Sequence, residues 1–275
     1  MLDKVEVRTS QGAMLTLSLR NPSNGYSVED IEGTDPVKAN FVSSSMAGVD
    51  GEIYQTSKRE KRNLIFTLGF QPDYVNTTVS GLRKRLYDFF MPQSEVRLRF
   101  YSDDADPVDI IGRVEDFNAP KFTKDPGAII SILCFNPDFY DPTPTIFTGT
   151  TVGNTLETNL EYPGTVDTGV LFRLRVNRSL SAFSIYHRPG DGSIRTFDFS
   201  TALPLVSGDV LRVSSVRGDK YVTLYRNGVS KSYLSSMTPQ SSWLTLSPGL
   251  NQIRVFAEGA AVPYEIEYVT KIGAL

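Results

Sequence analysis

The chain has 275 residues, of which 40% are hydrophobic and 21% are charged, a composition typical of a globular protein and unlike that of a disordered one. Its net charge of −3 argues against a general affinity for nucleic acid, and its short apolar runs exclude a membrane-spanning segment. A single cysteine, Cys134, excludes an internal disulfide. Because the N-terminus does not resemble a signal peptide, we expect folding in a reducing cytoplasm.

Alternating hydrophobic and polar residues predict β-strands through most of the first half. The alternation is clear at residues 4–8, 15–20, 64–68 and 96–101. Residues 128–134 are apolar on both faces, which predicts a strand covered on both sides.

One amphipathic helix is predicted at residues 79–91, where the alternation stops. Its apolar positions recur at i, i+4, i+7 and i+8: Leu82, Leu86, Phe89 and Phe90. Ser80 is the predicted N-cap, and Pro92 ends the helix. We expect this helix to cover one face of the first sheet.

A domain boundary is predicted at the sequence NPDFYDPTP, residues 136–144. Residues 1–141 hold 16 basic and 21 acidic side chains (net −5), whereas residues 142–275 hold 12 and 10 (net +2). We therefore predict two domains, 1–141 and 142–275. The predicted hinge consists of Pro137, Asp141, Pro142 and Pro144, since proline lacks the amide donor that a central strand needs.

The second half shows only strand patterns, as at residues 170–176 and 264–268. The pair Asn227-Gly228 is typical of a tight hairpin turn. Short strands separated by Gly, Asp and Asn turns predict a β-sandwich or jelly roll.

Catalytic and metal-binding patterns are almost absent. The one histidine, His187, precedes a Pro-Gly turn and is interpreted as a turn residue, and Cys134 as a buried structural thiol. Asp138 and Asp141 could form a carboxylate pair, although turn and cap roles are more common beside prolines.

Two charged stretches are candidate binding sites. The acidic stretch at 102–109 does not fit a calcium-binding loop and is interpreted as a solvated turn. The basic cluster KREKR at 58–62 could bind an anion or a partner, or lie at a hairpin tip or edge strand. No nucleotide-binding loop occurs, so no cofactor and no metal is expected.

Several segments together resemble the distal tail protein (Dit) family of long-tailed bacteriophages. They follow the family's order, with a Gly-x-Asp-Gly turn at 48–51, a charged arm, the helix, and then Cys134, Pro137 and Phe139 in a Cys-x-x-Pro-x-Phe pattern. Residues 246–256 and 265–275 resemble the closing strands of the family's second domain.

The resemblance implies a non-enzymatic virion protein of the phage tail tip or baseplate, made in the host bacterial cytoplasm. Similar proteins form a homo-hexamer that joins the tail tube protein to the tail-tip hub protein, with DNA passing through the lumen without specific binding. The implied fold is mainly β, a ring-forming domain with one helix followed by a galectin-like or jelly-roll β-sandwich. The outer domain would take part in host attachment, through a receptor-binding protein or a cell-surface glycan.

Two hypotheses about contacts follow from the resemblance. An arm over residues 52–63 could reach a neighbouring subunit through Lys58, Arg59, Lys61 and Arg62. The acidic first half could give the ring a negative lumen that repels DNA phosphates.

An alternative function is carbohydrate binding by the sandwich domain. Exposed aromatic side chains would carry it, and the candidates are Tyr186, Tyr221, Tyr225, Tyr233 and Trp243. Trp243 is expected in the sandwich core, because Leu244 and Leu246 beside it follow a strand pattern. A glycosidase, the third hypothesis, would need two close carboxylates in a cleft.

Overall fold

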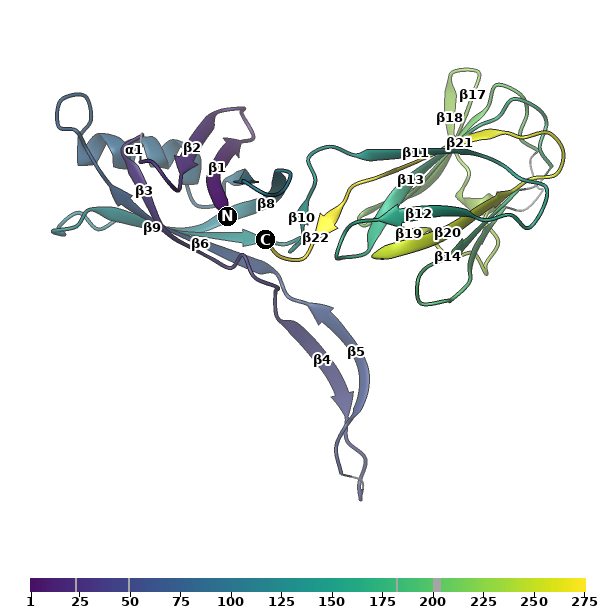
Figure 1. Cartoon of the computed structure of the whole chain (residues 1–275), viewed down its shortest axis with the longest axis horizontal. Coiled ribbons are helices and arrows are strands. Elements are labelled where there is room, and N and C mark those ends of the chain that lie inside the picture. The colour runs from purple at the N-terminus through teal and green to yellow at the C-terminus, as the bar shows by residue number, and fades with distance from the viewer. Residues whose placement is uncertain (23, 49, 182, 200–203) are drawn as a thin grey trace. The chain divides into compact units, whose positions relative to one another are not determined.

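A computed structural model describes residues 1–22, 24–48, 50–181, 183–199 and 204–275. The chain forms two compact units (Figure 1). The first contains Met1–Pro142 and also Ile272–Leu275, and the second contains Thr143–Lys271. The prediction that all of 142–275 lies in one domain therefore needs correcting, because the last four residues return to the first unit. The predicted fold class, mainly β with one α-helix, is confirmed.

The first unit is built on a nine-stranded sheet. Its main path runs β2-β1-β7-β8-β9-β6-β3, and β10 pairs with both β8 and β22. Alternation places one side of each strand in a shared core, which includes Val5, Leu98 and Ile130. The strands are β1 (Leu2–Thr9), β2 (Met14–Ser18), β3 (Tyr26–Glu32), β6 (Arg62–Phe70), β7 (Glu95–Ser102), β8 (Val108–Asn118), β9 (Gly127–Cys134), β10 (Phe139–Tyr140) and β22 (Lys271–Ile272).

Helix α1 (Val79–Phe90) covers this core, as the sequence predicted. The four apolar positions, Leu82, Leu86, Phe89 and Phe90, are all buried. The N-cap is Thr78 rather than the predicted Ser80, since the Thr78 hydroxyl accepts a hydrogen bond of 3.1 Å from the Gly81 amide. Ser80 lies inside the first turn.

A separate two-stranded hairpin extends from the first unit (Figure 1). Strand β4 (Ala39–Ser44) pairs with β5 (Ile53–Arg59) in antiparallel register. The connecting turn contains Gly48 and Gly51, whose positive φ values of 81° and 91° suit glycine. The described residues of 39–59 are called the arm below.

The second unit is a β-sandwich of two sheets that enclose one core. One sheet has the order β11-β21-β13-β16-β17-β18, with β19 beside β13, and the other has the order β12-β20-β14-β15. The strands are β11 (Thr145–Thr150), β12 (Thr158–Tyr162), β13 (Thr168–Arg175), β14 (Ser184–Arg188), β15 (Arg195–Asp198), β16 (Val210–Val216), β17 (Asp219–Arg226), β18 (Val229–Ser232), β19 (Thr245–Leu246), β20 (Gly249–Phe256) and β21 (Pro263–Tyr268); a short 3-10 helix, η1, spans Leu234–Ser236.

The predicted Asn-Gly hairpin is confirmed. Asn227 and Gly228 both have positive φ, 51° and 78°, between the paired residues Arg226 and Val229. Trp243 packs against the sandwich core but is only half-buried, so its predicted core position is confirmed only in part. In the part of the chain that the structure describes, no helix is long and apolar enough to cross a membrane.

Candidate interaction surface

The arm presents an unusual amount of apolar side-chain surface to solvent. Phe41, Tyr54 and Ile53 are 71%, 60% and 55% exposed. The rings of Phe41 and Tyr54 pack edge to face with centroids 6.3 Å apart, and the Tyr54 hydroxyl lies 2.9 Å from the Ser57 hydroxyl. Among the described residues, β4 and β5 pair only with each other. Because an isolated two-stranded hairpin is marginally stable in water, the arm needs further contacts.

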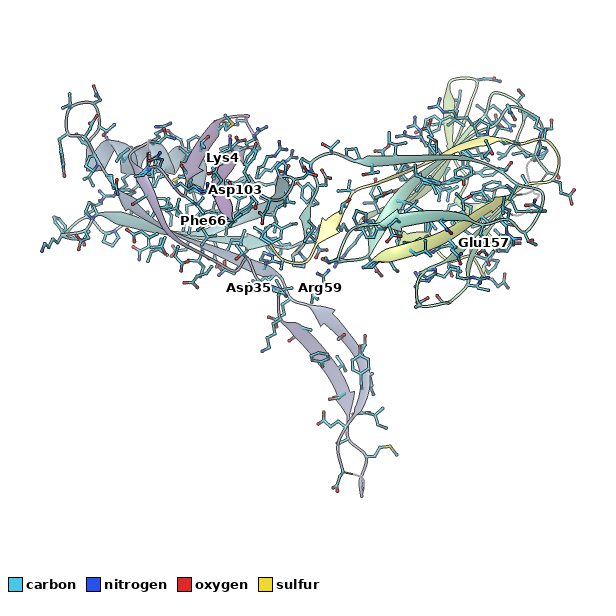
Figure 2. All side chains as sticks on the ribbon, in the orientation of Figure 1. Lys4, Asp35, Arg59, Phe66, Asp103 and Glu157 are labelled. Carbon is cyan, nitrogen blue, oxygen red and sulfur yellow. The ribbon has the colours of Figure 1, made fainter. Side chains whose placement is uncertain are left out.

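Arg59 joins the base of the arm to the body of the first unit. Its guanidinium donates to both carboxylate oxygens of Asp138, at 2.5 and 3.1 Å. Asp138 is only 4% exposed, whereas the Arg59 side chain is 38% exposed. Figure 2 shows Arg59 and Asp35 at this junction. Asp138, a candidate catalytic carboxylate from the sequence, instead forms a structural ion pair with Arg59.

Arg62 is a buried arginine at the same junction, with 1% of its surface exposed. Its guanidinium donates to four backbone carbonyl oxygens: Nε to Pro137 at 2.7 Å, Nη1 to Asp35 at 2.7 Å and also to Gly33, and Nη2 to Gly273 at 2.6 Å. It also lies 4.5 Å above the Phe139 ring. Burial lowers the pKa of the Arg62 guanidinium. These contacts hold together the segment that precedes the arm, the end of the first unit and the returning C-terminal residues.

The four predicted contact residues therefore have different positions. Lys58 on β5 and Lys61 beyond it are exposed, and Arg59 is held by Asp138. The expectation that Arg62 lies on the contact surface needs correcting, because its donors are used inside the first unit. Contact of the other three with another subunit stays a prediction.

The predicted hinge residues lie on both sides of the division between the units. Pro137 is buried and its carbonyl accepts from Arg62, while Asp141 and Pro142 end the first unit. Pro144 is exposed near the start of the second unit. Their role as a hinge stays a prediction.

His187 is a buried residue of β14 rather than a residue of the following turn, which corrects the interpretation from sequence. It is 2% exposed, and its Nε2 lies 2.9 Å from the Asn251 amide oxygen. Burial lowers the pKa of His187. Cys134 is also buried, as predicted, and burial raises its pKa to about 12.

The acidic stretch at 102–109 ends in a buried ion pair that sequence reasoning missed. Asp109 is fully buried and accepts two hydrogen bonds from Arg99, at 2.6 and 2.9 Å. Residues 103–106 form the exposed turn that was predicted, whereas Val108 is a buried residue of β8. Among the described residues, no group of three His, Cys, Asp or Glu side chains is arranged to hold a metal ion.

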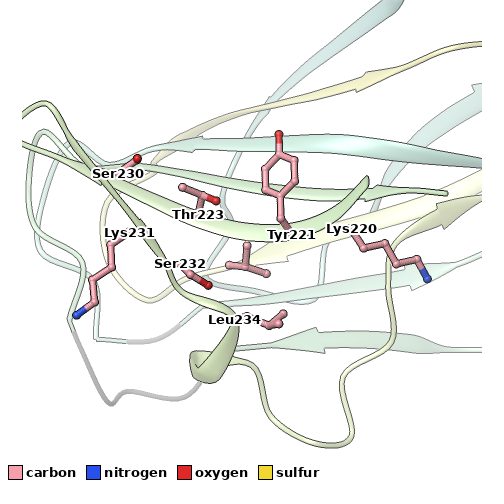
Figure 3. A pocket seen from close by; sticks show the side chains of 8 residues that line it. Lys220, Tyr221, Thr223, Ser230, Lys231, Ser232 and Leu234 are labelled. Carbon is pink, nitrogen blue, oxygen red and sulfur yellow. The ribbon is translucent and has the colours of Figure 1, made fainter. Parts of the chain in front are cut away.

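The aromatic candidates for sugar binding do not gather into one site. Tyr233 is buried, and Tyr186 and Tyr225 stack under arginines at 4.0 and 4.6 Å. Tyr221 borders a hollow of about 330 Å³ at strands β17 and β18 (Figure 3). Figure 3 shows Lys220 and Lys231, which also line this hollow, extending in opposite directions. The polar side chains of this hollow therefore do not point toward one common ligand position, as they do in a typical ligand pocket.

Comparison with known proteins defines the class of the second unit. Residues 163–271 match the family described as siphovirus-type tail component, C-terminal domain. The second unit is therefore similar to a tail-component domain of siphovirus type.

The fold of the whole chain matches that of one particular tail protein. The crystal structure of SPP1 Dit, described as a paradigm of hub adsorption apparatus in Gram-positive infecting phages, has a TM-score of 0.68 at 17% identity, over 97% of this chain and 98% of that chain. The resemblance to the Dit family predicted from the sequence is confirmed by this shared fold and by the domain match.

Weaker similarity extends to the phage p2 baseplate in its activated conformation. The structure with Sr has a TM-score of 0.46 at 9% identity, over 96% of this chain and 97% of that chain. The structure with Ca has the same score and identity, over 97% and 98%. No curated protein sequence matches the chain.

Proposed function

We propose that this chain is a structural protein of the phage tail tip, and that its first unit forms a hexameric ring. The ring would join the tail tube to the tail-tip hub. The tail-component domain and the Dit fold support the proposal. The observation that carries it is the arm, whose two strands pair only with each other among the described residues and whose apolar side chains are largely exposed.

In a ring, the neighbouring subunit would cover the exposed apolar side chains of the arm. Closed rings are built from heterologous contacts, in which each subunit offers two different surfaces to its two neighbours. A hairpin that leaves the body of the subunit supplies one of these surfaces. Burial of Phe41, Tyr54 and Ile53 on a neighbour would contribute about 1.5–3 kcal/mol for each fully buried side chain.

The remaining parts of the proposal concern DNA and the host. The first unit carries all of the excess negative charge of the chain, which favours free passage of DNA through a ring lumen. The second unit would anchor receptor-binding proteins. In this function the protein acts through its surfaces and catalyses no reaction.

The mass of the particle in solution tests the ring. Six copies of the 30.5-kDa chain give about 183 kDa. Light scattering should find this mass, and negative-stain images should show a sixfold ring. A monomer of 30.5 kDa at micromolar concentration would overturn the proposal.

A matched pair of variants tests the role of the arm. The double variant Phe41→Asp with Tyr54→Asp should reduce the ring to monomers, because it places two charges in the proposed contact. Phe122→Asp is the control, since Phe122 is fully exposed outside the arm. An intact ring in the double variant would exclude the arm as a subunit contact.

A further inference from the structure

A cross-strand row on the outer face of the first sheet combines arginine with exposed apolar side chains. Met14 pairs with Arg8, Arg8 pairs with Arg97, and Arg97 pairs with Ile111, across β2, β1, β7 and β8. Directly paired residues lie on the same face of a sheet. Met14 and Ile111, at the two ends of this row, are 53% and 38% exposed. These four residues are called the arginine row below.

The two arginines at the centre of the row are poorly neutralised. Arg8 donates at 3.0 Å to Glu6, whose other oxygen accepts from Lys4. Arg97 lies 4.0 Å from Asp109, which is already engaged twice by Arg99. The side chains of Arg8 and Arg97 are 42% and 50% exposed.

Charges on the neighbouring positions leave this face positive although the first unit is acidic. Lys4 and Arg99 lie on the same outer face as Arg8 and Arg97. The carboxylates on this face belong to Glu6 and Asp109, which are 7% and 0% exposed, and to Glu95, whose side chain is 46% exposed and ion-paired with Arg113. A partner would therefore meet cations flanked by apolar side chains.

The direct pairing of Arg8 with Arg97 breaks a rule of sheet stability. Like charges directly opposite each other destabilise a sheet, and such local conflicts are expected at sites that serve a function. Arginine is also enriched at protein interfaces, where its stem and planar head make apolar as well as charged contacts. The row thus has the chemistry of a docking surface for an acidic and apolar segment.

The far end of the arm has the complementary chemistry. Asp50 and Glu52 lie in the turn that joins its strands and are exposed, and Met46 and Ile53 nearby are 56% and 55% exposed. The cations of the hairpin, Lys58 and Arg59, lie instead at the end of β5 that joins the body. The arm therefore presents carboxylates and apolar side chains where it is farthest from its own unit.

We infer that the arm of one copy docks on the arginine row of the next copy in the ring. This inference rests on the proposed hexamer and specifies the two surfaces that meet. Asp50 and Glu52 neutralise Arg8 and Arg97, while the apolar side chains of the arm cover Met14 and Ile111. Because the contact is partly ionic, assembly should slow and weaken as salt is added.

Charge exchange between two variants tests the pairing. One variant carries Asp50→Arg with Glu52→Arg, and the other carries Arg8→Glu with Arg97→Glu. Each variant alone should form at least about tenfold less ring than wild type, since 1.4 kcal/mol of lost contact energy gives that factor. An equimolar mixture should restore the ring, because arms and rows of opposite charge then alternate around it.

The outcomes separate the inference from the proposed ring. A monomeric wild type would overturn both. A wild-type ring with variants that assemble alone, or with folded variants that fail to assemble when mixed, would overturn the docking and leave the ring standing.

Cross-linking gives a second measurement that leaves the arginine row and the carboxylates of the arm unchanged. Gln55→Cys on the arm and Arg113→Cys, two positions after Ile111 on the same strand, should be joined between copies by a short bis-maleimide. The control is Gln55→Cys with Phe122→Cys. The native Cys134 is buried and adds little background. Equal yields in the two pairs, or a higher yield in the control, would overturn the docking.

Discussion

Replacement of Arg62 by methionine should selectively destabilise the first unit. The substitution removes a buried guanidinium that donates to four backbone carbonyls, those of Pro137, Asp35, Gly33 and Gly273. Hydrogen bonds to a charged group contribute about 2 kcal/mol each, or about 8 kcal/mol for four. Removing the charge also recovers a burial cost of about 5 kcal/mol. The expected net loss in the free energy of unfolding is about 3 kcal/mol.

Two residues of the native chain, Cys134 and Trp243, allow the unfolding of the first unit to be measured separately from that of the second. Cys134 is the single cysteine and lies in the first unit, whereas the single tryptophan, Trp243, lies in the second. A loss of about 3 kcal/mol should lower the temperature at which Cys134 becomes reactive by about 6–12 °C. The fluorescence transition of Trp243 should move much less.

Arg113→Met is the matched control, since Arg113 forms an ion pair with Glu95 while 56% exposed. Exposed ion pairs contribute about 0–1 kcal/mol, so the control should melt close to wild type. Arg62 does not stabilise the first unit as proposed if Arg62→Met and Arg113→Met expose Cys134 at the same temperature, or if only the Trp243 transition moves.

Three further substitutions or conditions have defined outcomes. Asp109→Asn leaves the largely buried Arg99 without its carboxylate, so calorimetry should show a loss of about 3 kcal/mol; an unchanged midpoint would contradict a structural role for the pair. Burial lowers the folded-state pKa of His187 below its usual 6.5, so the unfolded chain binds the proton first and stability is lost as pH falls below about 6.5. The Trp243 melting temperature should show this loss in wild type and not in His187→Gln, and equal pH profiles would refute it. Thr78→Ala should cost about 1 kcal/mol in urea unfolding through loss of the helix N-cap, whereas Ser80→Ala should cost less.

Local patterns in the sequence predicted the features that depend on neighbouring residues. Helix α1 was located by its 3.6-residue period, and the Asn227-Gly228 turn by the backbone angles that these residues tolerate. The N-cap was misplaced by two residues because both Thr78 and Ser80 carry hydroxyl groups suited to the role. Only the backbone geometry distinguishes them.

Features that depend on distant partners were missed. Arg62 belongs to the basic cluster at 58–62, and charged residues in such a cluster are usually exposed. Its partners are backbone carbonyls, one of them at Gly273, and backbone groups carry no signal in a sequence. Asp109 and His187 were misjudged for the same reason, since their partners, Arg99 and Asn251, are known only once the strands are paired.

The return of the chain to the first unit has a consequence for the order of folding. Strand β22 pairs with β10, yet all of the second unit except its last residue, Lys271, is synthesised between these two strands. During translation the first sheet therefore lacks this strand until the second unit has been made. Until then Arg62 also lacks its hydrogen bond to the Gly273 carbonyl. If the second unit folds first, it brings the two strands together and lowers the entropy cost of closing so long a loop. The inserted unit would then act as an internal folding aid for the unit that surrounds it.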